Sequence, residues 1–354
     1  MAGDSKAKVI PLHGNSGRAA AQRRAGQRTQ GSRQHPSLLS EPDTRASADE
    51  IAAVVREIDQ HRRSASRSGG EQPSNELAQR VTAVADFVRH RLTGDYSVDE
   101  FGFDPHFNDA IVRPLLRFFF KSWFRVEVSG IEHLPDTGAG LVVANHAGVL
   151  PFDGLMASVA VHDEHPAHRD LRLLAADMVF DLPMVSAAAR KAGHTMACTA
   201  DAHRLLAAGQ LTAVFPEGYK GLGKRFKDRY KLQRFGRGGF VAAALRTKAP
   251  IIPCSIVGSE EIYPKIGDLR LLARLLGLPY FPITPLFPLA GPAGLIPLPS
   301  KWYIEFGTPF PTEEFDDTAP EDPMVTFELT DQVRETIQRT LHRRLINRGN
   351  TFLG

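Results

Sequence analysis

Short apolar runs alternate with helix-like patterns through the second half of the chain. In the helix-like stretches, apolar positions recur with the period of one helical face, whereas the runs are short and almost uniformly apolar. Apolar strands that alternate with helices are typical of a largely parallel sheet buried on both faces. We therefore predict an α/β fold, a largely parallel sheet flanked by helices. The expected strands are 141–144, 171–175, 195–198, 211–215 and 251–257, and the expected helices are 151–161, 184–192 and 200–208.

The same pattern divides the chain into four regions. Residues 104–312 form the expected catalytic domain, which includes a late strand at 302–306. Residues 313–354 form an amphipathic C-terminal helix and tail, because apolar residues recur there at helical spacing between Val333 and Leu345. Residues 46–103 form a helical extension, in which two amphipathic helices flank a Ser- and Gly-rich break.

Residues 1–45 lack a hydrophobic period and are expected to be a disordered basic tail. The first 40 residues hold seven Lys or Arg against one Asp and contain no aromatic residue. Such an arm suits an anionic lipid surface or a plain solubilising tail, and without aromatics it offers no base stacking, so we expect no nucleic-acid partner. No N-terminal apolar segment resembles a signal peptide, so secretion is not expected.

Composition places the chain among ordinary globular proteins, with 42% hydrophobic and 23% charged residues. Its two cysteines, Cys198 and Cys254, each stand inside an apolar run, which favours buried thiols in a reducing cytosol. Three histidines in 162–168 are interrupted by Pro166 and do not share a helical face, so we expect a polar loop there and no metal site.

Two apolar segments carry features of a membrane interface. Residues 110–125 place a basic residue every four positions among five aromatics, as in a helix at the lipid headgroup boundary, although an ordinary core helix fits the same pattern. Residues 275–300 contain no charge but seven prolines, which excludes a spanning helix because prolines leave carbonyls unpaired in lipid. We expect an irregular apolar loop that lines an acyl groove, dips into the interface or packs over the sheet.

The candidate chemistry begins where the strand 141–144 ends. Asn145 and His146 follow that strand directly, and Asp153 stands seven positions after His146. The carboxyl ends of strands in α/β sheets present polar groups from the following loop. A histidine there can take a proton from a hydroxyl when a carboxylate fixes its tautomer. By itself this pair favours a simpler interpretation, in which Asp153 caps a helix and His146 is an ordinary loop histidine.

A second motif follows another apolar strand. Phe215, Pro216, Glu217 and Gly218 close the run LTAV, so an ionisable Glu is placed at a strand end between Pro and Gly. A solvated turn would look the same in isolation. Two such loops after two strands favour a shared site.

Together these residues resemble the glycerolipid and lysophospholipid acyltransferase superfamily, in the branch similar to monoacylglycerol and diacylglycerol acyltransferases. The resemblance covers about residues 125–310 and includes a late apolar-Pro block, Ile251 to Cys254, and a Tyr230 to Phe240 stretch. It implies that His146 is the general base and Asp153 its partner. It also implies that Asn145, Phe215, Pro216, Glu217 and Gly218 contact substrate, with Glu217 holding the acceptor.

The motif departs from the widespread pattern at two points. Six residues separate His146 from Asp153, where most members have four. Members that use phosphorylated acceptors carry an arginine in the mid-region block, where this chain has Thr199. The departure favours a neutral lipid alcohol as acceptor.

Residues 220–237 hold eight Lys or Arg against Asp228 alone. Such a cluster can bind coenzyme A phosphates, a carrier protein or anionic lipid heads, or it can be a solvated loop. We expect Lys224 and Arg225 to bind substrate. The spacing of the glycines does not match a nucleotide P-loop.

The predicted function is peripheral O-acyl transfer at the cytoplasmic face of a membrane, from acyl-CoA or acyl carrier protein to a lipid hydroxyl. No cofactor or metal is expected beyond the acyl donor as co-substrate, since a thioester is already activated. Two alternatives stay open, an acyl-thioester hydrolase and a non-catalytic lipid-binding protein on the same fold. The sequence has no G-x-S-x-G motif, which excludes a nucleophile-elbow esterase.

Overall fold

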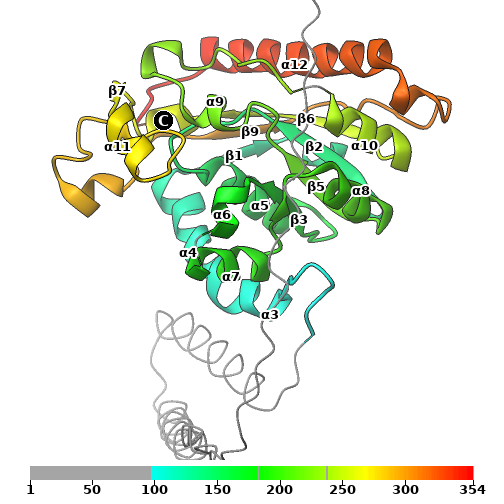
Figure 1. Ribbon diagram of the computed structural model, residues 1–354, viewed down its shortest axis with the longest axis horizontal. Helices are drawn as coiled ribbons and strands as arrows, with labels where there is room; N and C mark the ends of the chain where they lie inside the picture. The colour runs from blue at the N-terminus through cyan, green and yellow to red at the C-terminus, as the bar shows by residue number, and fades with distance from the viewer. Residues whose placement is uncertain (1–96, 182, 237, 354) are drawn as a thin grey trace, which may run out of the picture. The chain divides into compact units, whose positions relative to one another are not determined.

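The computed structural model describes residues 97–353 apart from residues 182 and 237. The predicted basic tail 1–45 and most of the helical extension 46–103 lie outside the described residues. Figure 1 shows the arrangement of the described elements around one central sheet.

The sheet has seven strands in the order β1-β9-β6-β2-β5-β3-β4. All neighbouring strands run parallel except β6 and β9, which are antiparallel. The predicted, largely parallel α/β sheet is therefore confirmed. The strands are β1 (Glu127–Ser129), β2 (Gly140–Ala144), β3 (Leu171–Ala175), β4 (Thr195–Met196), β5 (Leu211–Val214), β6 (Ile251–Val257) and β9 (Tyr303–Phe306).

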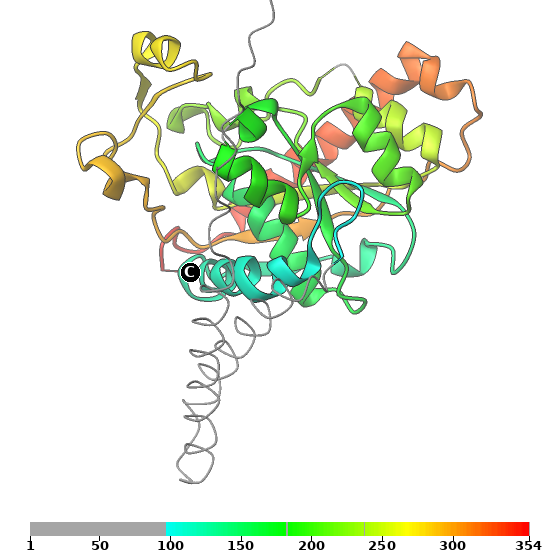
Figure 2. The ribbon, with the colours of Figure 1, turned by 60° about the horizontal axis from the view of Figure 1, so that its bottom comes forward.

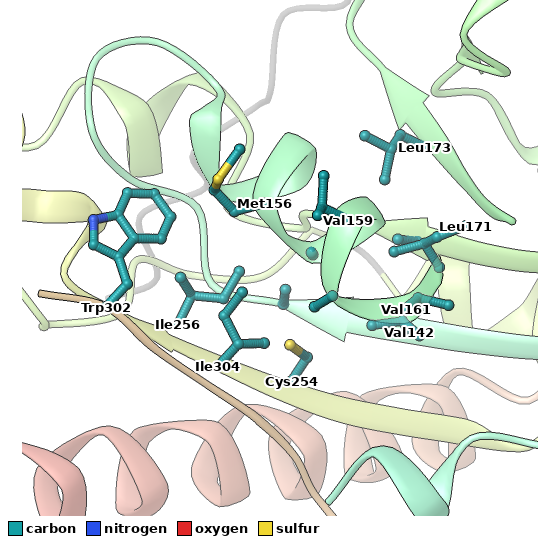
Figure 3. Packing of buried hydrophobic residues seen from close by; sticks show 14 of the residues in the cluster. Val142, Met156, Val159, Val161, Leu171, Leu173, Cys254, Ile256, Trp302 and Ile304 are labelled. Atoms are coloured by element: carbon teal, nitrogen blue, oxygen red, sulfur yellow. The ribbon is translucent and has the colours of Figure 1, made fainter. Parts of the chain in front are cut away.

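Alternate residues of the central strands point to two separate cores. Val142 and Ile252 face a core that contains Met156 and Trp302, whereas Leu141 and Ile251 face the other. This alternation follows from the two-residue period of a strand, and both faces are apolar because both are covered. Figure 3 shows the first core, where Met156 and Val159 of the helix α5 lie over the strands.

Helices cover each face of the sheet. The first core is closed by α5 (Phe152–Glu164) and by the aromatic segment 118–124. The second core is closed by α8 (Thr199–Ala207), α10 (Gly239–Thr247) and α12 (Pro323–Ile346), and α12 packs on β6 (Figure 1). The shorter elements are η3 (Ile131–His133), α6 (Asp177–Asp181), α7 (Pro183–Lys191), α9 (Tyr219–Leu222), η4 (Phe226–Asp228), η5 (Ser259–Glu261) and η7 (Ala319–Glu321).

The segment with a basic residue at every fourth position, residues 110–125, does not form one regular α-helix. Residues 105–123 form α3 (Pro105–Phe107), η1 (Asn108–Val112), α4 (Arg113–Arg117) and η2 (Phe118–Trp123), with η1 and η2 in π-helical geometry. Arg113 is buried and paired with Asp109 and Asp170. Arg117 forks onto Asp163 of α5, with 2.7 Å between Nη2 and Oδ1. The expected basic face is therefore incomplete, because Arg113 is buried among carboxylates and Arg117, which is 38% exposed, is held by Asp163.

The predicted irregular apolar loop, residues 275–300, lies within the connection between β6 and β9. That connection contains β7 (Gly267–Asp268), α11 (Arg270–Leu275), β8 (Pro282–Ile283) and η6 (Gly291–Leu295). β7 and β8 pair with each other in a two-stranded ribbon separate from the main sheet. Figures 1 and 2 show this segment, coloured yellow to orange, projecting beyond the main sheet. Among the described residues, no helix combines the length and apolar character needed to span a bilayer.

Candidate active site

The loop after β2 brings His146 and Asp153 together. Five buried residues of β2 end at Ala144, and Asp153 is the second residue of α5. Between them, Gly148 (φ +95°) and Val149 (φ +64°) both adopt the left-handed region. Two consecutive residues with positive φ fold the chain back on itself. The six-residue spacer therefore closes, and His146 Nδ1 lies 2.7 Å from Asp153 Oδ2.

Asp153 is fully buried and has three donors around it. Its Oδ2 accepts from the backbone N–H of Ala147 at 2.8 Å as well as from His146, and its Oδ1 accepts from the N–H of Gly154 at 2.8 Å. Because a carboxylate can only accept hydrogen bonds, Nδ1 of His146 must be the ring nitrogen that carries the proton. Nε2 then carries the lone pair, and no described residue donates to it or accepts from it. The His146 side chain is 11% exposed, so the ring has access to solvent.

Glu217 comes from the neighbouring strand and supports the same loop. Because β2 and β5 are parallel neighbours, the loops that follow them meet at one edge of the sheet. Glu217 Oε1 accepts from the backbone N–H of His146 at 2.9 Å, and Oε2 accepts from the N–H of Gln233 at 2.6 Å. The Phe215 ring lies against the His146 imidazole, with 4.6 Å between ring centroids.

This geometry differs from the expected grip of Glu217 on an acceptor. Its side chain is fully buried, and both oxygens are occupied by backbone amides. The Glu217 side chain points into the protein rather than towards the edge of the sheet, and Gly218 (φ +53°) turns the chain immediately after it. In this structure Glu217 fixes the position of His146, and its contact with substrate stays a prediction.

Gly221 permits the close approach of the two loops. A Cβ at this position would lie 2.5 Å from the carbonyl oxygen of His146 and 2.8 Å from the Cβ of Glu217. Both neighbours are closer than real Cβ contacts allow, and one is backbone. Only glycine fits here without moving the His146 loop.

Asn145 joins β2 to β6. Its Nδ2 donates to the carbonyl oxygen of Ile256 at 2.9 Å, and its Oδ1 accepts from the N–H of Ile256 at 2.7 Å. The buried amide thereby mimics one more backbone pair of the sheet, just beyond the last residue of β2. Its predicted contact with substrate stays a prediction, because the structure occupies the group with the sheet.

Lys224, which was expected to bind substrate, borders the same small pocket as Arg225, but its ammonium is paired with carboxylates. Its Nζ is buried 3.4 Å from Glu217 Oε2 and 2.9 Å from Glu260 Oε1. Burial raises the pKa of Glu260 to about 7, against the opposing pull of Lys224. In this structure the Lys224 ammonium is held between two carboxyl groups, and its contact with substrate stays a prediction. Arg225 is exposed and, with Gly148 and Val149 of the His146 loop, borders a small pocket.

Several contacts around the site had little or no signal in the sequence. Glu260 and Glu261 follow β6 as consecutive carboxylates, which was the one available hint. Tyr280 donates from its hydroxyl to the Val149 carbonyl at 2.5 Å and so braces the left-handed turn. Lys265 Nζ donates to the Gly223 carbonyl at 2.7 Å. Both residues come from the apolar segment far along the chain, so no local pattern marks them.

The remaining candidate positions lie apart from these contacts. Thr199 is exposed at the start of α8. His162 pairs with Asp163 at 3.2 Å, and His168 bonds to a backbone carbonyl. Over the described part of the chain, no three His, Cys, Asp or Glu side chains converge as a metal-binding group.

Comparison with known proteins extends these observations. The acyltransferase family model matches residues 125–257, which include both strand-end motifs. An uncharacterized protein of Mycobacterium bovis is 76% identical over 100% of this chain and 99% of its own, and one of Mycobacterium leprae is 73% identical over 100% and 98%. A Bos taurus protein described as a DGAT1/2-independent enzyme synthesizing storage lipids is 25% identical over 63% of this chain and 61% of its own. The crystal structure of the 1-acyl-sn-glycerophosphate acyltransferase PlsC from Thermotoga maritima is similar with a TM-score of 0.45, at 20% identity over 69% of this chain and 83% of that one.

Proposed function

The chain belongs to the acyltransferase superfamily, and from this premise we propose that it moves a fatty acyl group from a thioester to a lipid hydroxyl with His146 as general base. The donor in this proposal is acyl-CoA or acyl carrier protein. The observation that carries it is the 2.7 Å hydrogen bond between His146 Nδ1 and Asp153 Oδ2. That bond fixes the tautomer whose Nε2 can accept a proton.

The chemical step follows from this tautomer. The acceptor hydroxyl gives its proton to Nε2 while its oxygen attacks the thioester carbonyl carbon, and the carbonyl electrons move to oxygen. Collapse of the tetrahedral intermediate breaks the C–S bond, and the leaving sulfur takes the proton back from Nε2. Asp153 offsets the positive charge that the imidazole carries between these two transfers. The products are the ester and the free thiol, and the enzyme is regenerated.

The acceptor in this proposal is a neutral glyceride or another uncharged lipid alcohol. Two observations support it. Thr199 stands where members acting on phosphorylated acceptors have arginine. Lys224, the cation beside Glu217, is already held by two carboxyl groups. We assign the exposed Arg225 to the donor's phosphates, because it borders the same pocket as the His146 loop.

We place the enzyme at the cytoplasmic face of a membrane as a peripheral protein. The water-insoluble acceptor requires access to a lipid phase, and the apolar segment between β6 and β9 exposes several large side chains.

The test is release of free thiol from palmitoyl-CoA by the wild type and by His146→Ala, with liposomes and a panel of acceptors. The panel contains water alone, monoacylglycerol, diacylglycerol and lysophospholipids. His162→Ala is the matched control, because His162 also pairs with an Asp through Nδ1 but lies away from the His146 loop. Loss of a general base lowers turnover by about 10²–10⁴-fold.

Each outcome separates the functions. Release that requires monoacylglycerol or diacylglycerol and disappears in His146→Ala supports the proposal. Release with water alone identifies a thioester hydrolase. If no acceptor gives release, the assay is repeated with palmitoyl-acyl carrier protein as the donor. Failure with both donors refutes acyl transfer and leaves a lipid-binding protein.

A further inference from the structure

We propose that residues 266–296, here called the apolar excursion, dock into the headgroup boundary of an anionic bilayer, with the neighbouring basic loop, residues 220–234, resting on the lipid phosphates. The choice of a lipid partner rests partly on the proposed function, since a lipid acceptor must leave a membrane to reach His146. The remaining argument comes from exposure, charge and contacts.

The apolar excursion carries large side chains that no other part of the described chain covers. Leu271 and Leu275 lie four residues apart on α11, so they share one helical face, and each is 80% exposed. Leu289 is 90% exposed. Exposed apolar groups gathered on one projecting segment indicate a binding surface rather than ordinary surface scatter. Six large apolar side chains of the apolar excursion are more than half exposed: Ile266, Leu271, Leu275, Leu276, Leu289 and Ile296.

The charges of the apolar excursion suit a phosphate surface. Its single carboxylate, Asp268, is paired with Lys265 at 2.8 Å. Its two cations, Arg270 and Arg274, are exposed and alternate with the leucines of α11. Arginines beside exposed leucines can reach lipid phosphates while the leucines enter the acyl region.

The basic loop is attached directly to the base of the apolar excursion. The N–H of Phe226 donates to the carbonyl of Lys265 at 2.9 Å, and Lys265 Nζ donates to the carbonyl of Gly223 at 2.7 Å. Cations near a membrane surface are attracted by anionic lipids, and their effects add. Apart from Arg225, which is assigned above to the acyl donor, the exposed cations of the loop are Lys220, Lys227, Arg229, Lys231 and Arg234.

The same base contacts the His146 loop. Tyr280 donates to the Val149 carbonyl at 2.5 Å, and Lys265 Nζ lies 4.5 Å from the centre of the Tyr280 ring. Gly148, Val149, Arg225 and Lys265 border one pocket. Insertion of the apolar excursion therefore brings the His146 side of the sheet to the lipid surface, where the acceptor hydroxyl is found.

The first experiment measures flotation of the full chain with vesicles of phosphatidylcholine mixed with phosphatidylglycerol. Leu271→Asp combined with Leu275→Asp is compared with Met324→Asp combined with Leu353→Asp, which are also exposed but lie outside the apolar excursion. Each leucine that no longer enters the acyl region weakens partitioning by roughly tenfold. The control pair is expected to float as the wild type does.

A second readout locates the inserted segment and does not depend on the basic N-terminal tail. A fluorophore on Leu289→Cys, in a Cys198→Ser background that removes the exposed native thiol, is exposed to vesicles of brominated lipid. We expect quenching at this position and none for the same fluorophore on Met324→Cys. Light scattering without vesicles reports whether a second copy of the chain covers the surface instead.

The outcomes are separable from those of the catalytic test. Docking is supported if the Leu271→Asp/Leu275→Asp variant floats more weakly than the wild type while the control pair and His146→Ala float normally, and if the fluorophore on Leu289→Cys is quenched. This result supports docking even if acyl transfer fails. Unchanged flotation of the leucine pair, or no quenching at Leu289→Cys, overturns the proposal. A dimer in solution that the leucine pair dissociates also overturns it, because the partner is then a second copy.

Discussion

Replacing Asp153 by Asn tests the link between the buried carboxylate and the chemistry of His146. The two side chains have nearly the same shape, so the change exchanges one acceptor oxygen for a donor and removes one charge. If the amide oxygen stays at the Oδ2 position, its NH₂ group faces the N–H of Gly154. If the amide turns over, the NH₂ group faces the N–H of Ala147 and His146 Nδ1, and Nδ1 must then become the acceptor. In that second orientation the proton moves to Nε2, which can no longer act as a base.

The magnitude follows from burial and charge. Opposite unit charges about 4 Å apart interact by roughly 4 kcal/mol at an effective dielectric constant of about 20, which corresponds to about three powers of ten in rate. The imidazolium formed during acyl transfer loses this interaction with Asp153, so kcat should fall about 10²–10⁴-fold. One buried donor is left without an acceptor in either orientation, which lowers the free energy of unfolding by about 1–3 kcal/mol.

The assay is thiol release from palmitoyl-CoA at saturating acceptor, together with urea denaturation of each variant. Asp163→Asn is the control, because it makes the same substitution ten residues further along α5 and weakens only the pairs of Asp163 with Arg117 and His162. It should leave kcat within about twofold of the wild type, since neither pair involves the His146 loop. A folded Asp153→Asn variant whose kcat stays within about threefold of the wild type would refute the tautomer argument.

Three further predictions concern the frame around the site. Gly221→Ala should lower kcat and reduce the free energy of unfolding by about 1–3 kcal/mol, because the added methyl meets the carbonyl of His146. The control Gly236→Ala, which has open space around it, should change neither quantity in turnover and urea-denaturation measurements. Asn145→Ala should cost about 2–4 kcal/mol by the same denaturation assay, because it leaves a buried N–H and a buried carbonyl of β6 without partners, and a loss below about 0.5 kcal/mol would contradict this. Burial lowers the pKa of His194 from 6.5 to about 4, so the stability it confers is present above pH 6.5 and is lost as the pH falls towards 4. His194→Gln should flatten the stability profile in that window by roughly 2–3 kcal/mol, and an unchanged slope would show that the group does not titrate this way.

Local patterns were sufficient to predict the sheet. Strands 171–175 and 251–257 have the bounds predicted from apolar runs, and the helix at 151–161 was found at Phe152–Glu164. This was possible because burial of a strand or helix requires apolar residues at a fixed spacing, and that spacing can be read directly from the sequence. The meeting of His146 with Glu217 was also foreseeable in outline, because parallel strands end at one edge of a sheet.

The directions of the polar groups were decided only by the tertiary structure. Spacing alone could not show that Gly148 and Val149 turn left-handed and return Asp153 to His146. Nor could it show that Lys224 is buried, since the two carboxyl groups beside it come from positions before and well after it in the chain. The inward turn of Arg113 likewise depends on Asp170, 57 residues away. A buried charge takes the orientation that satisfies it, and its partners are set by packing between distant segments rather than by neighbouring residues.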